Sequence, residues 1–142
     1  MKTFLLSFCA LLISTAIFAQ QKKADDAVKF VEVKHNFGKI KQGTPVTYDF
    51  AFKNVSPKQV VIESATASCG CTTPKWPQTP ISKNKTEKIS AGFNAAAPGI
   101  FEKTIYVKVT GYDQPIELKI SGEVLTPEDY AKYASSVEKK TK

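Results

Sequence analysis

Apolar and polar residues alternate along most of the chain, and this alternation constrains the fold more than any other sequence feature. In the run 46–53, Val46, Tyr48, Phe50 and Phe52 would share one face of a strand. Successive side chains of a strand point to opposite faces, so such a run buries one face and exposes the other. The period recurs in further short runs, namely 28–34, 59–66, 87–93, 104–109 and 116–121, with a short edge piece near Phe37 and Ile40.

Turn signals rich in glycine and proline separate these runs, for example Gly43-Thr44-Pro45 and Ala97-Pro98-Gly99. Six or seven short strands with no helical period between them are typical of an all-β, immunoglobulin-like β-sandwich. We therefore predict one such domain of about seven strands over residues 28–125. The sequence lacks the widely spaced cysteine pair that bridges the sheets of antibody domains, so apolar packing alone must hold the core.

Residues 1–19 have the pattern of a secretory signal peptide. Lys2 supplies the positive charge, an apolar stretch runs from Phe4 to Phe18, and Ala19 precedes Gln20 at a position that fits cleavage. The apolar stretch is shorter than the roughly 20 residues that a membrane-spanning helix needs. We expect cleavage after Ala19, a mature protein that does not span the membrane, and a periplasmic or secreted location where disulfides can form.

Two further segments flank the predicted sandwich. Residues 20–27 are polar and charged, and we expect a flexible leader there. Residues 126–142 predict a short helix or a solvated tail. Thr126 suits a helix cap, Pro127 suits the first turn, and the acidic residues that follow favour the positive end of the helix dipole.

The charge of the chain argues against a nucleic-acid partner. The sequence has 20 basic and 13 acidic residues, a net charge of +7, and every basic residue is lysine. Arginine supplies the planar group that usually recognises phosphates and guanine, and lysine does not. Because the lysines are scattered along the strands, we interpret the charge as a contribution to solubility and predict no nucleic-acid binding.

The long segment between the strands that end near Thr66 and begin near Thr86 is the main candidate for a functional site. Loops of this length in compact domains are often functional. It contains Cys69 and Cys71, the only cysteines after the signal peptide, within Ser-Cys-Gly-Cys-Thr-Thr. Three prolines restrict the loop, and we expect Trp76 to anchor it on the sandwich.

Cys69 and Cys71 can form a disulfide, hold a soft metal such as copper or zinc, or act in thiol redox chemistry. In an extended chain their Cα atoms would lie about 6.5 Å apart, close to the upper limit for a disulfide, and Gly70 permits a tighter backbone. A metal needs more ligands. The mature chain has one histidine, His35, and no methionine, so a closed Cys₂His₂ zinc site is impossible within one chain.

The sequence contains no Gly-x-Ser-x-Gly or His-Glu-x-x-His motif. We therefore predict no catalytic residues and no cofactor. Cys69 and Cys71 stay as candidates for a disulfide, a metal site or a redox site, with His35 as a further metal ligand only if its strand end lies beside the loop.

Landmarks in a fixed order give the chain a family resemblance. They are Phe37-Gly38-Lys39-Ile40, Gly43, Phe52-Lys53-Asn54, Ser68-Cys69-Gly70-Cys71-Thr72-Thr73-Pro74-Lys75-Trp76, Ile81, Pro98-Gly99-Ile100-Phe101-Glu102-Lys103 and Gly122. With these, residues 30–124 resemble an exported bacterial domain of unknown function, numbered fifteen-seventy-three, which is common in Bacteroidetes. The resemblance implies an immunoglobulin-like sandwich, similar to sperm-protein and cilia-associated domains that mostly mediate protein contacts, and a bacterial envelope setting. It implies no catalytic residues.

Taken together, these features predict an exported, non-enzymatic immunoglobulin-like domain. We expect it to serve as a protein-binding or structural module of the bacterial envelope, with an unknown envelope protein as its partner. The alternative is a thiol redox or soft-metal protein that uses the Cys-Gly-Cys loop.

Overall fold

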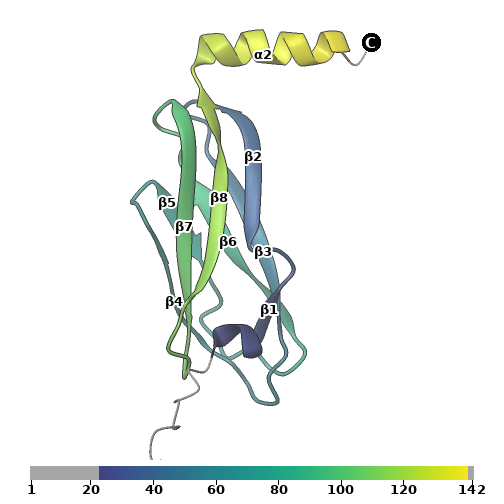
Figure 1. The fold of residues 1–142 in the computed structure, drawn as a ribbon, viewed down its shortest axis with the longest axis vertical. Coiled ribbons are helices and arrows are strands. Elements are labelled where there is room, and N and C mark those ends of the chain that lie inside the picture. Colours follow the sequence, from purple (N-terminus) through teal and green to yellow (C-terminus); the bar gives the residue numbers. More distant parts are fainter. Residues whose placement is uncertain (1–22, 141–142) are drawn as a thin grey trace, which may run out of the picture.

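The computed structural model describes residues 23–140 as a sandwich of two four-stranded sheets, followed by one helix (Figure 1). One sheet has the order β1-β3-β6-β5 and the other the order β2-β8-β7-β4. The strands are β1 (Val28–Phe30), β2 (Lys34–Lys41), β3 (Val46–Asn54), β4 (Ile62–Ala67), β5 (Thr72–Lys75), β6 (Thr86–Phe93), β7 (Gly99–Val109) and β8 (Ile116–Leu125). The predicted all-β sandwich is confirmed, with eight strands in place of about seven.

The two ends of the described chain bear on two sequence predictions. The predicted signal peptide, residues 1–19, and its cleavage after Ala19 lie outside the described residues. The flexible leader predicted for residues 20–27 differs from the structure from Ala24 onward, because Ala24–Asp26 form the short 3₁₀ helix η2. Ala24 and Ala27 are buried, and the Ala27 carbonyl accepts a hydrogen bond from the Val55 N–H at 2.8 Å. Two small apolar side chains inside a charged segment thus join the core.

The run 28–34, predicted as a single strand, divides between the two sheets. β1 pairs antiparallel with β3, whereas β2 pairs parallel with β8. The chain crosses from one sheet to the other at residues 31–33, and Val31 is 82% exposed there. β-branched residues suit a strand in either sheet, so the sequence pattern does not mark the crossing.

The core lies between the inner faces of the two sheets. Phe50 and Phe52 on β3 are fully buried against the other sheet, as are Ile105 on β7 and Leu118 and Ile120 on β8. Burial of each such side chain contributes about 1.5–3 kcal/mol. These side chains occupy alternate positions on their strands, as the period of two predicts.

One polar side chain is buried at the end of β3. Asn54 is fully buried, and its amide nitrogen donates to the carbonyls of Ile81 at 2.8 Å and Lys58 at 2.9 Å. Its amide oxygen accepts from the Ser56 N–H at 2.8 Å. The side chain therefore joins the β3–β4 turn to the segment before β6, where Ile81 forms a bridge with Val60.

We expect Asn54→Ala to lower the free energy of unfolding by roughly 2–4 kcal/mol, because it removes three hydrogen bonds of a fully buried side chain, each worth about 1 kcal/mol. Urea denaturation measures the change. The matched control is Asn36→Ala, since Asn36 is exposed and accepts one hydrogen bond from the Gly38 N–H at 2.7 Å. Equal losses in the two variants would contradict a special role for Asn54.

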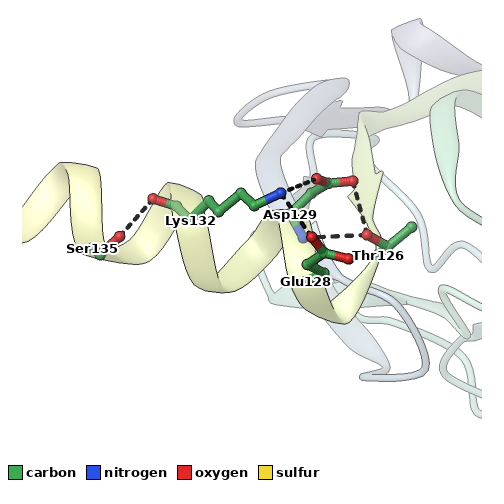
Figure 2. A network of polar contacts seen from close by, with 5 residues as sticks. All are labelled: Thr126, Glu128, Asp129, Lys132 and Ser135. Carbon is green, nitrogen blue, oxygen red and sulfur yellow. Dashed lines mark hydrogen bonds and ion pairs between the residues drawn. The ribbon is translucent and has the colours of Figure 1, made fainter.

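The C-terminal segment forms the predicted helix, α2 (Pro127–Lys140), which lies across the end of the sandwich (Figure 1). Figure 2 shows the polar contacts at its start. The Thr126 hydroxyl accepts from the Asp129 N–H at 3.2 Å, so the predicted cap is confirmed. Lys132 lies 2.8 Å from Glu128 one turn before it. Of the helices within residues 23–140, none is long and apolar enough to cross a membrane.

Asp49 lies on the outer face of the first sheet, opposite Ser90 in the β3–β6 register. Hydrogen bonds from Lys88 and then from Ser90 hold the pKa of the Asp49 carboxyl below its usual value. This ion pair therefore stabilises the fold above the ordinary pKa of aspartate. The contribution is lost as the pH falls through the lowered pKa of the folded state.

We expect side-chain carbonyl NMR to show that Asp49 titrates below an ordinary aspartate, and Ser90→Ala to raise its pKa. Because both partners are exposed, Asp49→Asn should reduce stability near neutral pH by less than about 1 kcal/mol. A carboxyl that titrates at the ordinary value in the wild-type protein would sink this prediction.

Candidate functional site

Three connecting segments are joined by hydrogen bonds toward the end of the sandwich from which α2 leaves; two lie at that end, and the third, between β4 and β5, lies on the flank below it (Figure 1). They are the β2–β3 turn at 42–45, the Cys-Gly-Cys turn at 68–71 and the β6–β7 loop at 94–98. We call this the loop end. The Gln42 N–H donates to the carbonyl of Leu125 at 2.8 Å, which brings the β2–β3 turn to the start of the helix.

Backbone hydrogen bonds tie the β6–β7 loop to its neighbours. The Asn94 N–H donates to the Cys71 carbonyl at 3.1 Å, and the Gly43 N–H donates to the Ala95 carbonyl at 2.9 Å. Ala95 is fully buried with φ of 51°, a left-handed conformation that a residue with a β-carbon disfavours. Such conformations persist where the surroundings impose them, and they cluster at functional sites.

The structure joins Cys69 and Cys71 in a disulfide, with their Cα atoms 5.3 Å apart. This separation is shorter than an extended chain allows, because the backbone turns at Gly70. Thr72 is buried beneath the bond, with its hydroxyl 3.7 Å from the sulfur of Cys69 and 4.0 Å from that of Cys71. On the other side, the Ser68 N–H donates to the Thr104 carbonyl of β7 at 2.9 Å.

The segment after the disulfide contains a strand that the sequence did not predict. Residues 72–75 form β5, which pairs antiparallel with β6 at the sheet edge. Pro74 lacks an N–H and is tolerated because β5 is an edge strand. Trp76 is half-buried and packs against the core, which is the position expected of a loop anchor.

The metal candidates do not come together. The sulfurs of Cys69 and Cys71 are bonded to each other, so neither is a thiolate ligand. His35 stacks on Tyr48 with 3.5 Å between ring centroids, and it meets the edge of Phe37 at 4.7 Å. Across residues 23–140, no three His, Cys, Asp or Glu side chains are grouped so that they could hold a metal ion.

Two hollows flank Ile100, near the start of β7. The glycine hollow, of about 400 Å³, is lined by residues that include Asn36, Gly38, Lys39, Phe101, Gly122 and Glu123. The disulfide hollow, of about 230 Å³, is lined by residues that include Cys71, Phe93, Asn94, Pro98, Phe101 and Lys103. Ile100 lines both hollows and is 89% exposed.

Phe101 contributes to both hollows and is itself buried. Its ring stacks on Phe93 of the other sheet, with 4.1 Å between centroids. A β-carbon on Gly122 would lie 2.9 Å from this ring and 2.8 Å from the carbonyl oxygen of Gly38, so only glycine fits there. The glycine hollow thus depends on close backbone packing.

Lys103 and Ile100 both break the alternation of β7. Phe101 and Ile105 point to the core, and Lys103 between them shares their phase but lies at the rim. Ile100 shares the phase of the exposed residues. The sequence signal that could have identified both positions is a break in the alternation of β7. Ile100 is apolar at a position where the strand is otherwise polar, and Lys103 is charged at a position where it is otherwise apolar. From the sequence alone, both positions stand out only as family landmarks.

Comparison with solved structures finds chains of similar fold. The chain is similar to the ASH/PapD-like domain 7 of human CEP192, with 11% identity and a TM-score of 0.60 over 80% of this chain and 96% of that one. It is similar to a protein of unknown function from Porphyromonas gingivalis W83, with 12% identity and a TM-score of 0.60 over 69% of this chain. This chain covers 46% of that protein, less than half its length. These likenesses show the fold alone.

The sequence places the chain in a particular family. The profile described as Protein of unknown function (DUF1573) matches residues 28–124, and the chain belongs to this family. The resemblance that the Cys-Gly-Cys-Thr segment suggested is therefore confirmed. A third structural likeness is to the VesB protease of Vibrio cholerae, with 11% identity and a TM-score of 0.56 over 72% of this chain and 33% of that one. No curated protein matches the sequence.

We expect the double variant Cys69→Ser, Cys71→Ser to lower the free energy of unfolding by about 1–2 kcal/mol, since the bond closes a very short loop. Urea denaturation measures the loss. The intact mass of a chain that begins at Gln20 should rise by about 2 Da on reduction, the mass of two hydrogens. Thiols that alkylate without prior reduction would contradict the pairing.

Proposed function

We propose that this protein is an exported, non-enzymatic binding module of the bacterial envelope, which holds a partner protein at its loop end. The observation that carries the proposal is Ile100. This large apolar side chain is 89% exposed on a strand and has a hollow on each side. A partner could bury the side chain and fill the two hollows with its own side chains.

The rigidity of the loop end supports a role in binding. Hydrogen bonds join its loops, the disulfide restrains the Cys-Gly-Cys turn, and the Phe93–Phe101 stack supports the hollows from below. A surface that is already ordered loses little conformational entropy when a partner binds. The envelope setting rests on the signal-peptide pattern of residues 1–19.

Site-specific photo-cross-linking in the source bacterium tests this function. With the photoreactive residue p-benzoylphenylalanine at Ile100, we expect a discrete adduct with one envelope protein, on a mature chain that begins at Gln20. The matched control places the same residue at Tyr106, which lies on the same face of β7 farther from the loop end and is 39% exposed.

Competition makes the cross-linking result specific. Excess wild-type protein should abolish the adduct at position 100, whereas excess Ile100→Ser protein should not. Equal adducts at positions 100 and 106, or none at position 100, would overturn the proposal.

A further inference from the structure

We infer that the partner binds as an extended segment that adds a strand to the open edge of β7 and places a carboxylate against Lys103 in the disulfide hollow. This inference rests on the proposed function, because it specifies how the loop end would hold its partner.

The open edge arises because β7 is longer than its neighbour β4. The register of the two strands runs from Ile62 opposite Val109 to Ala67 opposite Ile105. The Ser68 N–H then reaches the Thr104 carbonyl, and the chain turns away through the disulfide. Residues 99–103 of β7 pair with β8 on one side and, within the described residues 23–140, have no strand on the other.

The backbone groups on that open side can be identified from the strand geometry. The N–H and the carbonyl of Thr104 both face β4, since they bond with Ser68. In antiparallel pairing, alternate residues direct their backbone groups to the same neighbour. Ile100 and Glu102 therefore present an N–H and a carbonyl each to the open side. An exposed edge of this kind accepts an extended peptide by strand addition.

Charge selects the side chain that would enter the disulfide hollow. Lys103 lines this hollow, and none of the described residues that line it carries a carboxylate. Within residues 23–140, Lys103 has no ion-pair partner, whereas Lys108 on the same strand pairs with Glu63 at 2.8 Å. The Asn94 side chain in the hollow already accepts from the Ala96 N–H at 3.1 Å. The unpaired ammonium thus favours a carboxylate, which would form a charge-assisted hydrogen bond.

The glycine hollow has no unpaired lysine among its described residues that would favour a carboxylate. Lys39 there lies 3.6 Å from Glu123 and 5.3 Å from the centre of the Tyr133 ring, so its charge is already compensated. The partner segment is therefore expected to be acidic on the side of the disulfide hollow only. In a paired strand, the residue opposite Ile100 shares its face and is expected to be apolar. An acidic residue opposite Lys103 would lie three positions from it.

A phage-displayed library of random dodecapeptides, panned on the full mature protein, provides the probe. We expect enriched peptides to carry an apolar residue three positions from Asp or Glu, with no proline between them. Lys103→Gln should weaken binding of the best synthetic peptide about 10-fold or more, because a charge-assisted hydrogen bond is lost. Lys108→Gln, the matched control on the same strand, should leave the affinity unchanged.

N-methylation of the peptide tests strand addition on the wild-type protein, independently of any folding defect in the variants. Methyl groups on the alternate backbone nitrogens that face β7 should abolish binding. Methyl groups on the nitrogens between them, which face away from β7, should preserve it. Peptides that require Ile100 but bind Lys103→Gln normally, or that tolerate N-methylation in both phases, would overturn this inference and leave the proposed function standing. A failure to recover any peptide, together with no adduct at position 100, would overturn both.

Discussion

The apolar contact between the inner faces of the two sheets holds every other part of this protein in place. Phe50 and Phe52 on one sheet and Ile105 and Leu118 on the other are fully buried in the same hydrophobic cluster. The described disulfide lies within one turn and does not join the sheets across the core. Side-chain packing in the core sets the distance between the sheets. It therefore also fixes where each loop that crosses between the sheets begins and ends.

The two ends of the sandwich are closed by different interactions. At one end, the buried Asn54 side chain makes three hydrogen bonds, to Ser56 and Lys58 in the β3–β4 turn and to Ile81 before β6. At the loop end, backbone hydrogen bonds, the disulfide and the Phe93–Phe101 stack restrain the chain. At the loop end, two of the hollows lie on either side of the exposed Ile100. For this reason we propose the loop end as the place where a partner binds.

The Cys-Gly-Cys turn determines where β4 ends, which does not follow from the chemistry of its two cysteines. It takes the chain out of the second sheet directly after Ser68, so β4 ends while β7 continues toward the loop end. The same turn forms one wall of the hollow that contains Lys103. Its role in the proposed function is thus to create and border an open strand edge. No thiol chemistry is required for that role, because both sulfurs are bonded.

The sequence by itself determined the fold class, most of the strands and the cap of α2 at Thr126, because these depend on alternation and on local hydrogen bonding that neighbouring residues specify. It did not reveal the division of 28–34 between two sheets, the burial of Ala24, or the strand at 72–75, since each depends on which distant segment lies alongside. The candidate site was predictable only in part. The cysteines can be recognised in the sequence, but the interpretation of Ile100 and Lys103 depends on the fact that β4 ends before β7 does. Only the tertiary structure decided that, because the length of open edge depends on the pairing of strands that are far apart in sequence.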